Sequence, residues 1–313
     1  MRRVAVLCGG FGAARFLDGL RRIPDVELTC VANTADDIEY AGVHVSPDVD
    51  TVSYALAGIF DEQRGFGVVG DTFRNAEALR RYGSGWFAVG DVDLATSLRR
   101  TRLLRAGATL AEATADLARG LGLAAAVVPM SDDPVRTVVV TDEGRLAFQE
   151  YLVARRAGPA VRAVEYDGLA GARPAPPVLP ALRQADLVIL APSSPVASLG
   201  PILALPGVRD ALGAARVVAV SPVVSGLAPA TPPEQSRARV REAFLAAAGV
   251  EHTATSVAGL YAGFADAFVL DERDAGEVPA VAALGVTAVT ADTLATGADR
   301  VALAGTVLSA AGR

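Results

Sequence analysis

The segment from Asn33 to Asp50 concentrates side chains that can do chemistry. It reads NTADDIEYAGVHVSPDVD and follows Leu28–Ala32, a short apolar run typical of a buried parallel strand. Ligands of open α/β sheets bind beyond the carboxyl ends of such strands. We therefore expect Asn33, Asp36 and Asp37 on the rim of a binding site.

The two carboxylates of SPDVD, Asp48 and Asp50, could hold a metal ion. They are two residues apart and point the same way only if the backbone of this turn is extended. Hard carboxylate oxygens in this arrangement suit Mg²⁺ better than zinc. The alternative is a solvated acidic loop without a ligand.

The turn GGFG, which contains Gly9, Gly10, Phe11 and Gly12, stands where a first strand meets a helix. Glycines there let backbone amides and the helix N-terminus approach a phosphate closely. The turn lacks the Gly-Lys-Ser/Thr of a P-loop and the glycine spacing of the dinucleotide fingerprint. It resembles a phosphate cradle, although a plain tight turn is the commoner explanation.

Serine-proline turns end two later predicted strands. Ser193, Ser194 and Ser198 follow ADLVILAP, and Ser221 follows ARVVAV. Hydroxyls and proline-fixed backbone at such strand ends can recognise a base or a phosphate, whereas the alternative is a proline-stopped turn with a serine N-cap. Because both turns would lie opposite the glycine turn, the switch-point rule favours a nucleotide pocket.

The segment GWFAVGDVD forms a third polar cluster. Its aspartates, Asp91 and Asp93, are expected to cap the following helix and to complement its dipole. Trp86, the only tryptophan, either packs in the core, which is the commoner case, or stacks on a flat ligand.

The order of predicted elements indicates an α/β fold with a doubly wound, mostly parallel, Rossmann-like sheet. Arg3–Cys8, the turn GGFG, a helix at Ala13–Arg22 and Leu28–Ala32 make one βαβ unit. From Thr51 to Leu123, alanine- and leucine-rich segments with helical spacing and glycine ends predict a helical insertion.

The sheet is predicted to resume, with a small antiparallel part, after this insertion. Strands are expected at Ala124–Val128, Val135–Thr141 and Arg145–Val153, with a hairpin turn at 142–144. A proline-rich link at 173–180 then leads to a second alternating half, with helices near 208–212, 233–248 and 300–311. We expect one composite domain over residues 1–313.

Composition excludes several classes of partner. The chain of 313 residues carries a formal charge of −6, so it offers no basic field for nucleic acid. Cys8 and Cys30 fall in apolar runs and are expected to be buried structural thiols. The N-terminal apolar run is too short for a secretory signal and no segment is an uninterrupted membrane span, so we expect a cytoplasmic protein.

Taken in order, these motifs resemble the 2-phospho-L-lactate transferase family of coenzyme F420 biosynthesis, which includes the bacterial phosphoenolpyruvate-type transferases. The resemblance spans nearly the whole chain and rests on GGFG, NTADD, SPDVDTV, GWFAVGDVDLAT, PMSDDPVRT, FQEYLV, APSSPVASLGPIL, VVAVSPV and FVLDERD. Val92, Ser97 and Ser194 depart from the residues that the family more often has at those positions. These departures concern ligand contacts rather than family membership.

The resemblance implies an Mg²⁺-dependent transfer of a phospholactyl or phosphoenolpyruvyl group. The donor would be lactate or enolpyruvate activated by guanosine diphosphate, the acceptor the terminal hydroxyl of the deazaflavin Fo, and the by-product GMP. Positioning and charge stabilisation dominate such reactions at phosphorus. Histidine chemistry is not needed, and His44 and His252 receive no role. We also expect a homodimer.

Site roles follow from the same resemblance. Asp48 and Asp50 would be catalytic and, with Asp37, hold the metal; Asp50, Thr51, Trp86 and Asp91 would contact Fo. The nucleotide would bind at Gly9, Gly10, Phe11, Gly12, Asn33, Asp36, Ser193, Ser194, Ser198 and Ser221.

Two other classes of protein remain possible from the sequence. A related family with a similar glycine loop binds nucleotide sugars and acts in regulation, but its acidic motif continues with glycines, whereas Ile38-Glu39-Tyr40 follows here. A nicotinamide-dependent oxidoreductase would need the GxGxxG spacing, which this chain lacks.

Overall fold

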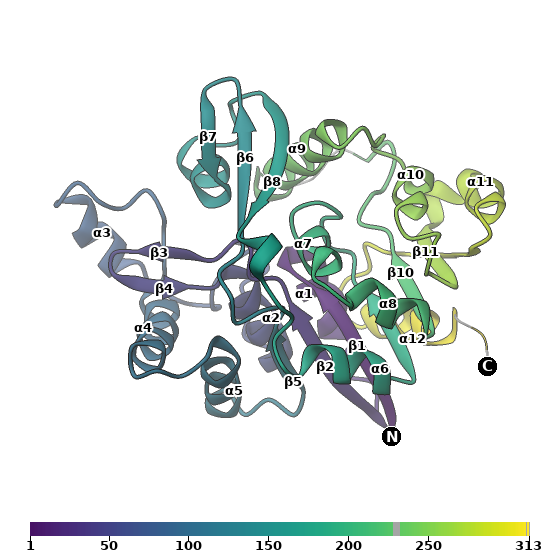
Figure 1. Ribbon diagram of the computed structural model, residues 1–313, viewed down its shortest axis with the longest axis horizontal. Helices are drawn as coiled ribbons and strands as arrows, with labels where there is room; N and C mark the ends of the chain where they lie inside the picture. The colour runs from purple at the N-terminus through teal and green to yellow at the C-terminus, as the bar shows by residue number, and fades with distance from the viewer. Residues whose placement is uncertain (228–231, 311, 313) are drawn as a thin grey trace.

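The computed structural model describes residues 1–227, 232–310 and 312, and in this part of the chain a sheet of seven parallel strands forms the centre (Figure 1). The strands lie in the order β12-β11-β10-β9-β1-β2-β5. The chain thus winds outward in both directions from β1, which confirms the predicted doubly wound α/β fold. The strand bounds are β1 (Arg2–Cys8), β2 (Val26–Ala32), β5 (Ala126–Pro129), β9 (Leu187–Leu190), β10 (Val217–Val220), β11 (Ala267–Asp271) and β12 (Thr287–Ala291).

Both faces of the sheet are buried, which explains why its strands read as continuous apolar runs. Along β1, Val4 and Val6 belong to one core cluster, whereas Ala5 and Leu7 belong to the other. Burial on both faces is the usual condition of a parallel sheet covered by helices.

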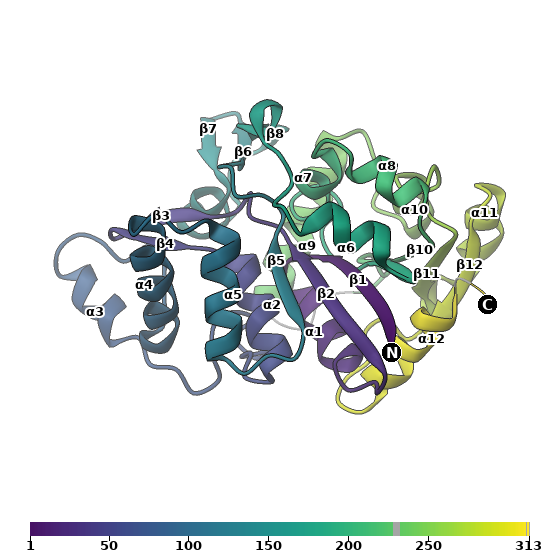
Figure 2. The same ribbon diagram turned by 60° about the horizontal axis from the view of Figure 1, so that its bottom comes forward.

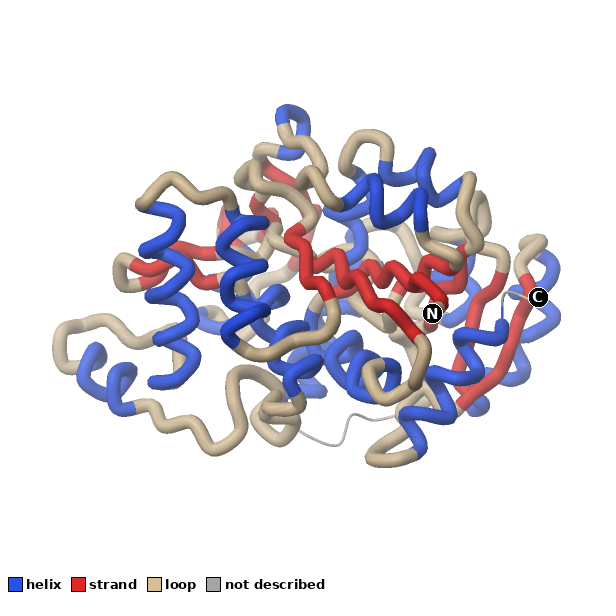
Figure 3. The backbone as a smooth tube through the Cα atoms, turned by 90° about the horizontal axis from the view of Figure 1, so that it is seen from below, coloured by secondary structure: helices blue, strands red, loops and turns tan. Residues whose placement is uncertain are grey.

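Helices cover each face, as Figure 3 shows. One core cluster includes residues of α1 (Gly10–Leu20), α2 (Pro47–Ala57) and α12 (Asp299–Ala310). The opposite cluster includes residues of α6 (Val178–Gln184), α7 (Leu199–Ala204), α8 (Val208–Gly213), α10 (Ala254–Gly259) and α11 (Val278–Ala283). None of the helices in the described residues is long and apolar enough to span a membrane.

A side lobe extends from the β5 edge of the sheet, on the left in Figure 1. It contains the hairpin β3 (Ile38–Tyr40) and β4 (Val43–Val45) with α3 (Arg74–Arg80), α4 (Asp91–Arg105) and α5 (Leu110–Gly120). The predicted insertion at 51–123 corresponds to this lobe only in part. Its first helix, α2, begins earlier and packs with α1 in the core through Val49, Val52 and Leu56.

A small antiparallel sheet with strand order β7-β6-β8 is separate from the central sheet. Its strands, at the top of Figure 2, are β6 (Arg136–Thr141), β7 (Gly144–Ala147) and β8 (Val161–Asp167). Helix α9 (Pro232–Ala247) packs against β8 (Figure 1). The predicted hairpin turn is confirmed. The predicted strand Arg145–Val153 is wrong beyond Ala147, where a π-helical turn at Glu150–Ala154 follows. There Phe148 and Tyr151, at helical spacing, pack on Phe244. Two 3₁₀ turns, Leu169–Gly171 and Glu272–Glu277, complete the described elements.

Candidate active site

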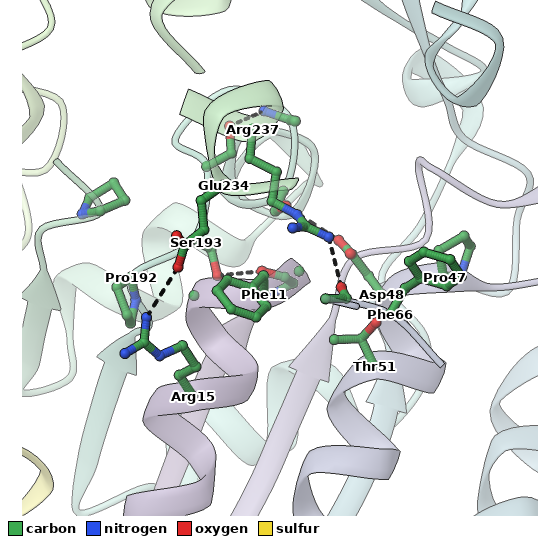
Figure 4. Close-up of a pocket in the computed structure, with 18 of the residues that line it drawn as sticks. Phe11, Arg15, Pro47, Asp48, Thr51, Phe66, Pro192, Ser193, Glu234 and Arg237 are labelled. Atoms are coloured by element: carbon green, nitrogen blue, oxygen red, sulfur yellow. Dashed lines mark hydrogen bonds and ion pairs between the residues drawn. The ribbon is translucent and has the colours of Figure 1, made fainter. Parts of the chain in front are cut away.

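A cavity of about 720 Å³ opens at the carboxyl ends of β1, β9 and β10, between α1, α2 and α9 (Figure 4). Many of the predicted site residues line it, from segments far apart in the sequence. They are Gly9, Gly10, Phe11, Gly12, Asp36, Asp48, Asp50, Thr51, Ser193, Ser194, Ser198 and Ser221. Asn33, Asp37, Trp86 and Asp91 are not among the lining residues.

The glycine turn is joined directly to the first serine turn. The Gly9 amide donates to Ser193 Oγ at 3.1 Å, and that hydroxyl donates to the Gly9 carbonyl at 2.8 Å. A Cβ on Gly12 would lie 2.1 Å from the Pro192 carbonyl oxygen, so only glycine allows this approach. Helix α1 starts at Gly10 without a side-chain cap from Gly9. Beyond the Gly10 amide, which faces Asp48, the amides of its first turn are available to an anion in the cavity.

Asp48 is the carboxylate that faces this turn. Its Oδ2 accepts from Asn33 Nδ2 at 3.0 Å and from Ser198 Oγ at 3.3 Å, and a Gly10 backbone contact also favours its charge. Burial nevertheless raises the pKa of Asp48 to about 6. Asn33 Oδ1 accepts from the Ala35 amide at 2.9 Å, so Asn33 positions Asp48 from behind the cavity wall.

Asp50 has a different environment from Asp48. The turn is not extended but is the first turn of α2, so the two side chains diverge. Both carboxylate oxygens of Asp50 accept from the buried guanidinium of Arg100, with Nη1 to Oδ2 at 3.1 Å. Asp37 accepts from Ser46 Oγ at 2.7 Å and pairs with His44 Nε2 at 2.9 Å. Because Asp50 is paired with Arg100 and Asp37 with His44 and Ser46, Asp48 is the carboxylate of the three that is most available to a ligand.

Two carboxylates at the cavity, Asp36 and Asp48, could share a divalent cation. Among the described residues, no three His, Cys, Asp or Glu side chains form a ready-made metal cluster. Magnesium, however, usually takes one or two carboxylates together with substrate phosphates. Asp36 and Asp48 line the same cavity, Asp36 Oδ1 is buried without a partner, and the charge of Asp48 helps burial to raise the Asp36 pKa. Such a pair fits a divalent cation that arrives with a phosphate.

The two aspartates of GWFAVGDVD, Asp91 and Asp93, lie in different environments, and only Asp93 lines the cavity. Asp91 does not cap α4 but accepts from the Arg74 and Asn75 amides of α3, at 3.2 and 3.0 Å. The amides at the start of α4 donate instead to Asp71, which the sequence did not single out. Asp93 lines the cavity, accepts from Tyr54 Oη at 2.8 Å, and has its pKa raised to about 7 by burial and the nearby Asp50.

Trp86 lies outside the cavity. The residue is 43% exposed, and its indole meets the Tyr40 ring edge-on, with ring centroids 5.6 Å apart. The next two residues, Phe87 and Ala88, line the cavity in its place.

Two arginines that sequence reasoning missed flank the Phe11 ring. Arg15 lies 5.6 Å from the ring centroid and Arg237, reaching over from α9, lies 5.0 Å from it (Figure 4). Arg237 donates to the Gly65 carbonyl at 2.7 Å, but its Nη1 is buried without a hydrogen-bond partner, and burial lowers its pKa. Arg15 follows the glycine turn on the same helix and could have been noted, whereas nothing near Arg237 in the sequence connects it to the site.

Comparison with known proteins agrees with these motifs and with the fold. Residues 4–304 match the family model described as 2-phospho-L-lactate transferase CofD. The chain is 39% identical over 297 residues to the 2-phospho-L-lactate transferase of Methanosarcina mazei, covering 94% of this chain and 95% of that protein. It is 43% identical over 294 residues to the phosphoenolpyruvate transferase of Streptomyces griseus, covering 91% and 90%.

A solved structure shares the fold at lower identity. A member of the UPF0052 family from Bacillus halodurans superposes with a TM-score of 0.64 at 18% identity, covering 98% of this chain and all of that chain. The family match over nearly the whole length, together with the two close relatives, shows that the chain belongs to the 2-phospho-L-lactate transferase CofD family of transferases.

Proposed function

We propose that the chain transfers a phospholactyl or phosphoenolpyruvyl group from a guanosine-diphospho-activated acid to the terminal hydroxyl of Fo. The hydroxyl oxygen forms a new bond to the phosphorus that bears the acid. The bond from this phosphorus to the bridging oxygen of the diphosphate breaks, and GMP leaves with that oxygen.

The convergence of Asp48, the amides at the start of α1 and Arg237 on one cavity carries this proposal. The amides and the unpartnered Arg237 Nη1 are donors for a diphosphate. With a pKa of about 6, Asp48 is mostly ionised at neutral pH and can accept the proton of the attacking hydroxyl.

Magnesium would be held by Asp48 and Asp36 and would neutralise charge on the phosphoryl oxygens. Arg15, which pairs with Glu234 at 3.8 Å, and Arg237 lie beside the Phe11 ring and can hold the leaving nucleotide.

The deazaflavin is proposed to lie on the side-lobe wall of the cavity. Thr51, Tyr54, Phe87 and Asp93 line that part, so Phe87 takes the place that the sequence alone suggested for Trp86. This wall adjoins Asp48 through α2, which would bring the acceptor hydroxyl toward the donor phosphate.

Nucleotide binding tests this proposal against the nucleotide-sugar alternative. Titration calorimetry should detect GDP binding, and GDP should raise the Tm by an amount that grows with its concentration. Gly9→Ala should weaken GDP binding at least tenfold, because its Cβ would lie 2.2 Å from Asp48 Oδ2. Gly120→Ala is the matched control, since a Cβ there meets nothing within 4 Å. Binding of UDP-sugars with no binding of GDP would instead favour the regulatory class.

A further inference from the structure

A second cavity of about 260 Å³, here called the rear cavity, lies between β8, α7, α8, α9 and α10. Apolar side chains make up most of its wall, among them Val196, Leu203 and Phe244. Tyr166, Tyr261 and Arg209 contribute the polar groups. The proposed transfer reaction uses none of these residues.

Tyr261, one of the residues that line the rear cavity, carries a buried hydroxyl without a partner. The residue is 1% exposed, and its Oη has no hydrogen-bond partner among the described residues. A buried hydroxyl without a partner has lost its hydrogen bonds to water, so a ligand that accepts a hydrogen bond from it would bind more tightly. Tyr166, by contrast, donates to the Val196 carbonyl at 2.6 Å and is already satisfied.

Arg209 supplies a positive charge at the same cavity. It is exposed, lies 5.5 Å from the Phe264 ring centroid, and forms no ion pair with any described residue. Its charge lowers the pKa of Tyr261 against the effect of burial, so the guanidinium and the phenol act on each other. A positive charge, an unused hydroxyl and an apolar wall together match an anion with an apolar body.

Two elements separate the rear cavity from the active-site cavity. In the turn 193–200, Ser194 and Ser198 line the active-site cavity, whereas Val196 and Gly200 line the rear cavity. Helix α9 contributes Arg237, Val240 and Arg241 to the first and Phe244 and Ala247 to the second. A ligand in the rear cavity would therefore press on the elements that hold Ser198 and Arg237.

We propose that the rear cavity is an effector site for a small organic carboxylate with an apolar body, and that its occupation changes nucleotide affinity at the active site. The carboxylate would pair with Arg209 and accept a hydrogen bond from Tyr261, while the apolar body would fill the space beside Phe244. The cavity volume of about 260 Å³ admits only a ligand smaller than a typical drug molecule. The coupling rests on the proposed nucleotide binding, whereas the site itself does not.

The probe is 3-phenylpropionate, with 3-phenylpropanamide as its neutral analogue of nearly equal size. Calorimetry on the full chain should show saturable binding of the acid and at least tenfold weaker binding of the amide. Arg209→Gln should weaken acid binding at least tenfold, because hydrogen bonds to charged groups contribute strongly. Arg81→Gln, which removes an exposed arginine in the side lobe, should leave it unchanged.

Tyr261→Phe separates the role of the hydroxyl from folding. It removes an unsatisfied group, so the Tm should not fall, while acid binding should weaken severalfold. Equal binding of acid and amide, or full acid binding by Arg209→Gln, would overturn the site.

The coupling is measured as the change in GDP affinity on saturation with the acid. An equal, reciprocal change in acid affinity on adding GDP should accompany it. An unchanged GDP affinity would overturn the coupling, whereas failure of GDP to bind at all would count against the proposed function and leave the direct binding test intact.

Discussion

Asp48 holds its charge at neutral pH at a cost to the stability of the fold. Its pKa is about 6 in the folded protein against 3.8 for an unperturbed aspartate, because burial disfavours the carboxylate more than Asn33 and Ser198 favour it. Because folding raises this pKa, the Asp48 carboxyl group loses its proton at a lower pH in the unfolded chain than in the folded protein. Stability therefore falls between about pH 4 and pH 6, by about 3 kcal/mol for this group.

Asp48→Asn should consequently stabilise the fold while it abolishes activity. The amide keeps an oxygen that can accept from Asn33 but carries no charge to desolvate. Urea unfolding at pH 7.5 should show a gain of about 1–3 kcal/mol that disappears near pH 4, where the wild-type group is already protonated. Loss of stability at pH 7.5 together with near-wild-type turnover would contradict the role given to Asp48.

Arg237 is predicted to bind the nucleotide rather than to stabilise the protein. Arg237→Gln should weaken GDP binding about tenfold or more, since it removes a guanidinium whose Nη1 has no protein partner in the described residues. Arg239→Gln, at an exposed position of the same helix, is the control and should bind GDP normally. Equal affinities of the two variants, measured by calorimetry, would remove Arg237 from the site.

Helix α4 is joined to α2 by one buried ion pair. Arg100 is fully buried and binds both oxygens of Asp50, which fixes the first turn of α2 and with it Asp48. Removing one partner of such a pair leaves a buried charge, although the pair as a whole need not be stabilising.

Arg100→Met should therefore lower the free energy of unfolding by about 3–5 kcal/mol. The double variant Asp50→Leu with Arg100→Met should recover most of that loss, because neither charge remains. Arg99→Gln, which breaks the exposed pair with Asp116, should change the free energy of unfolding far less than Arg100→Met, because water screens this pair. Denaturant unfolding of the three variants checks the prediction, and a double variant no more stable than Arg100→Met would refute it.

The sequence predicted the helices and strands better than it predicted the contacts between them. The parallel strands and the turn at Gly9–Gly12 follow from apolar runs and glycines. Asp91 binds amides of α3, whereas Asp71 binds the first amides of α4. This arrangement depends on two loops that meet in space, and no local sequence pattern predicts it. The length of β7 was overestimated because Phe148 and Tyr151 fit an apolar strand as well as a helical turn.

Over the whole molecule, the central sheet brings the predicted residues of four segments to one edge. The sequence predicted Gly9, Asp48, Ser193 and Ser221 beyond strand ends. The switch-point rule then predicted that they line one binding site, and all four line the cavity. The sequence could not place Arg237 at the cavity, because α9 reaches the cavity through its packing on β8. It also could not show that Trp86 lies outside the cavity, because the contact of Trp86 with Tyr40 is a tertiary one.

The transfer reaction itself gives the most direct test of the account. The protein would be incubated with Fo, Mg²⁺ and either guanosine-activated lactate or guanosine-activated enolpyruvate, and the products would be read by mass. We expect Fo to gain a phospholactyl or phosphoenolpyruvyl group with at least one donor, and GMP to appear in equal amount. Unchanged Fo with both donors, in a preparation that binds GDP, would contradict the proposed activity.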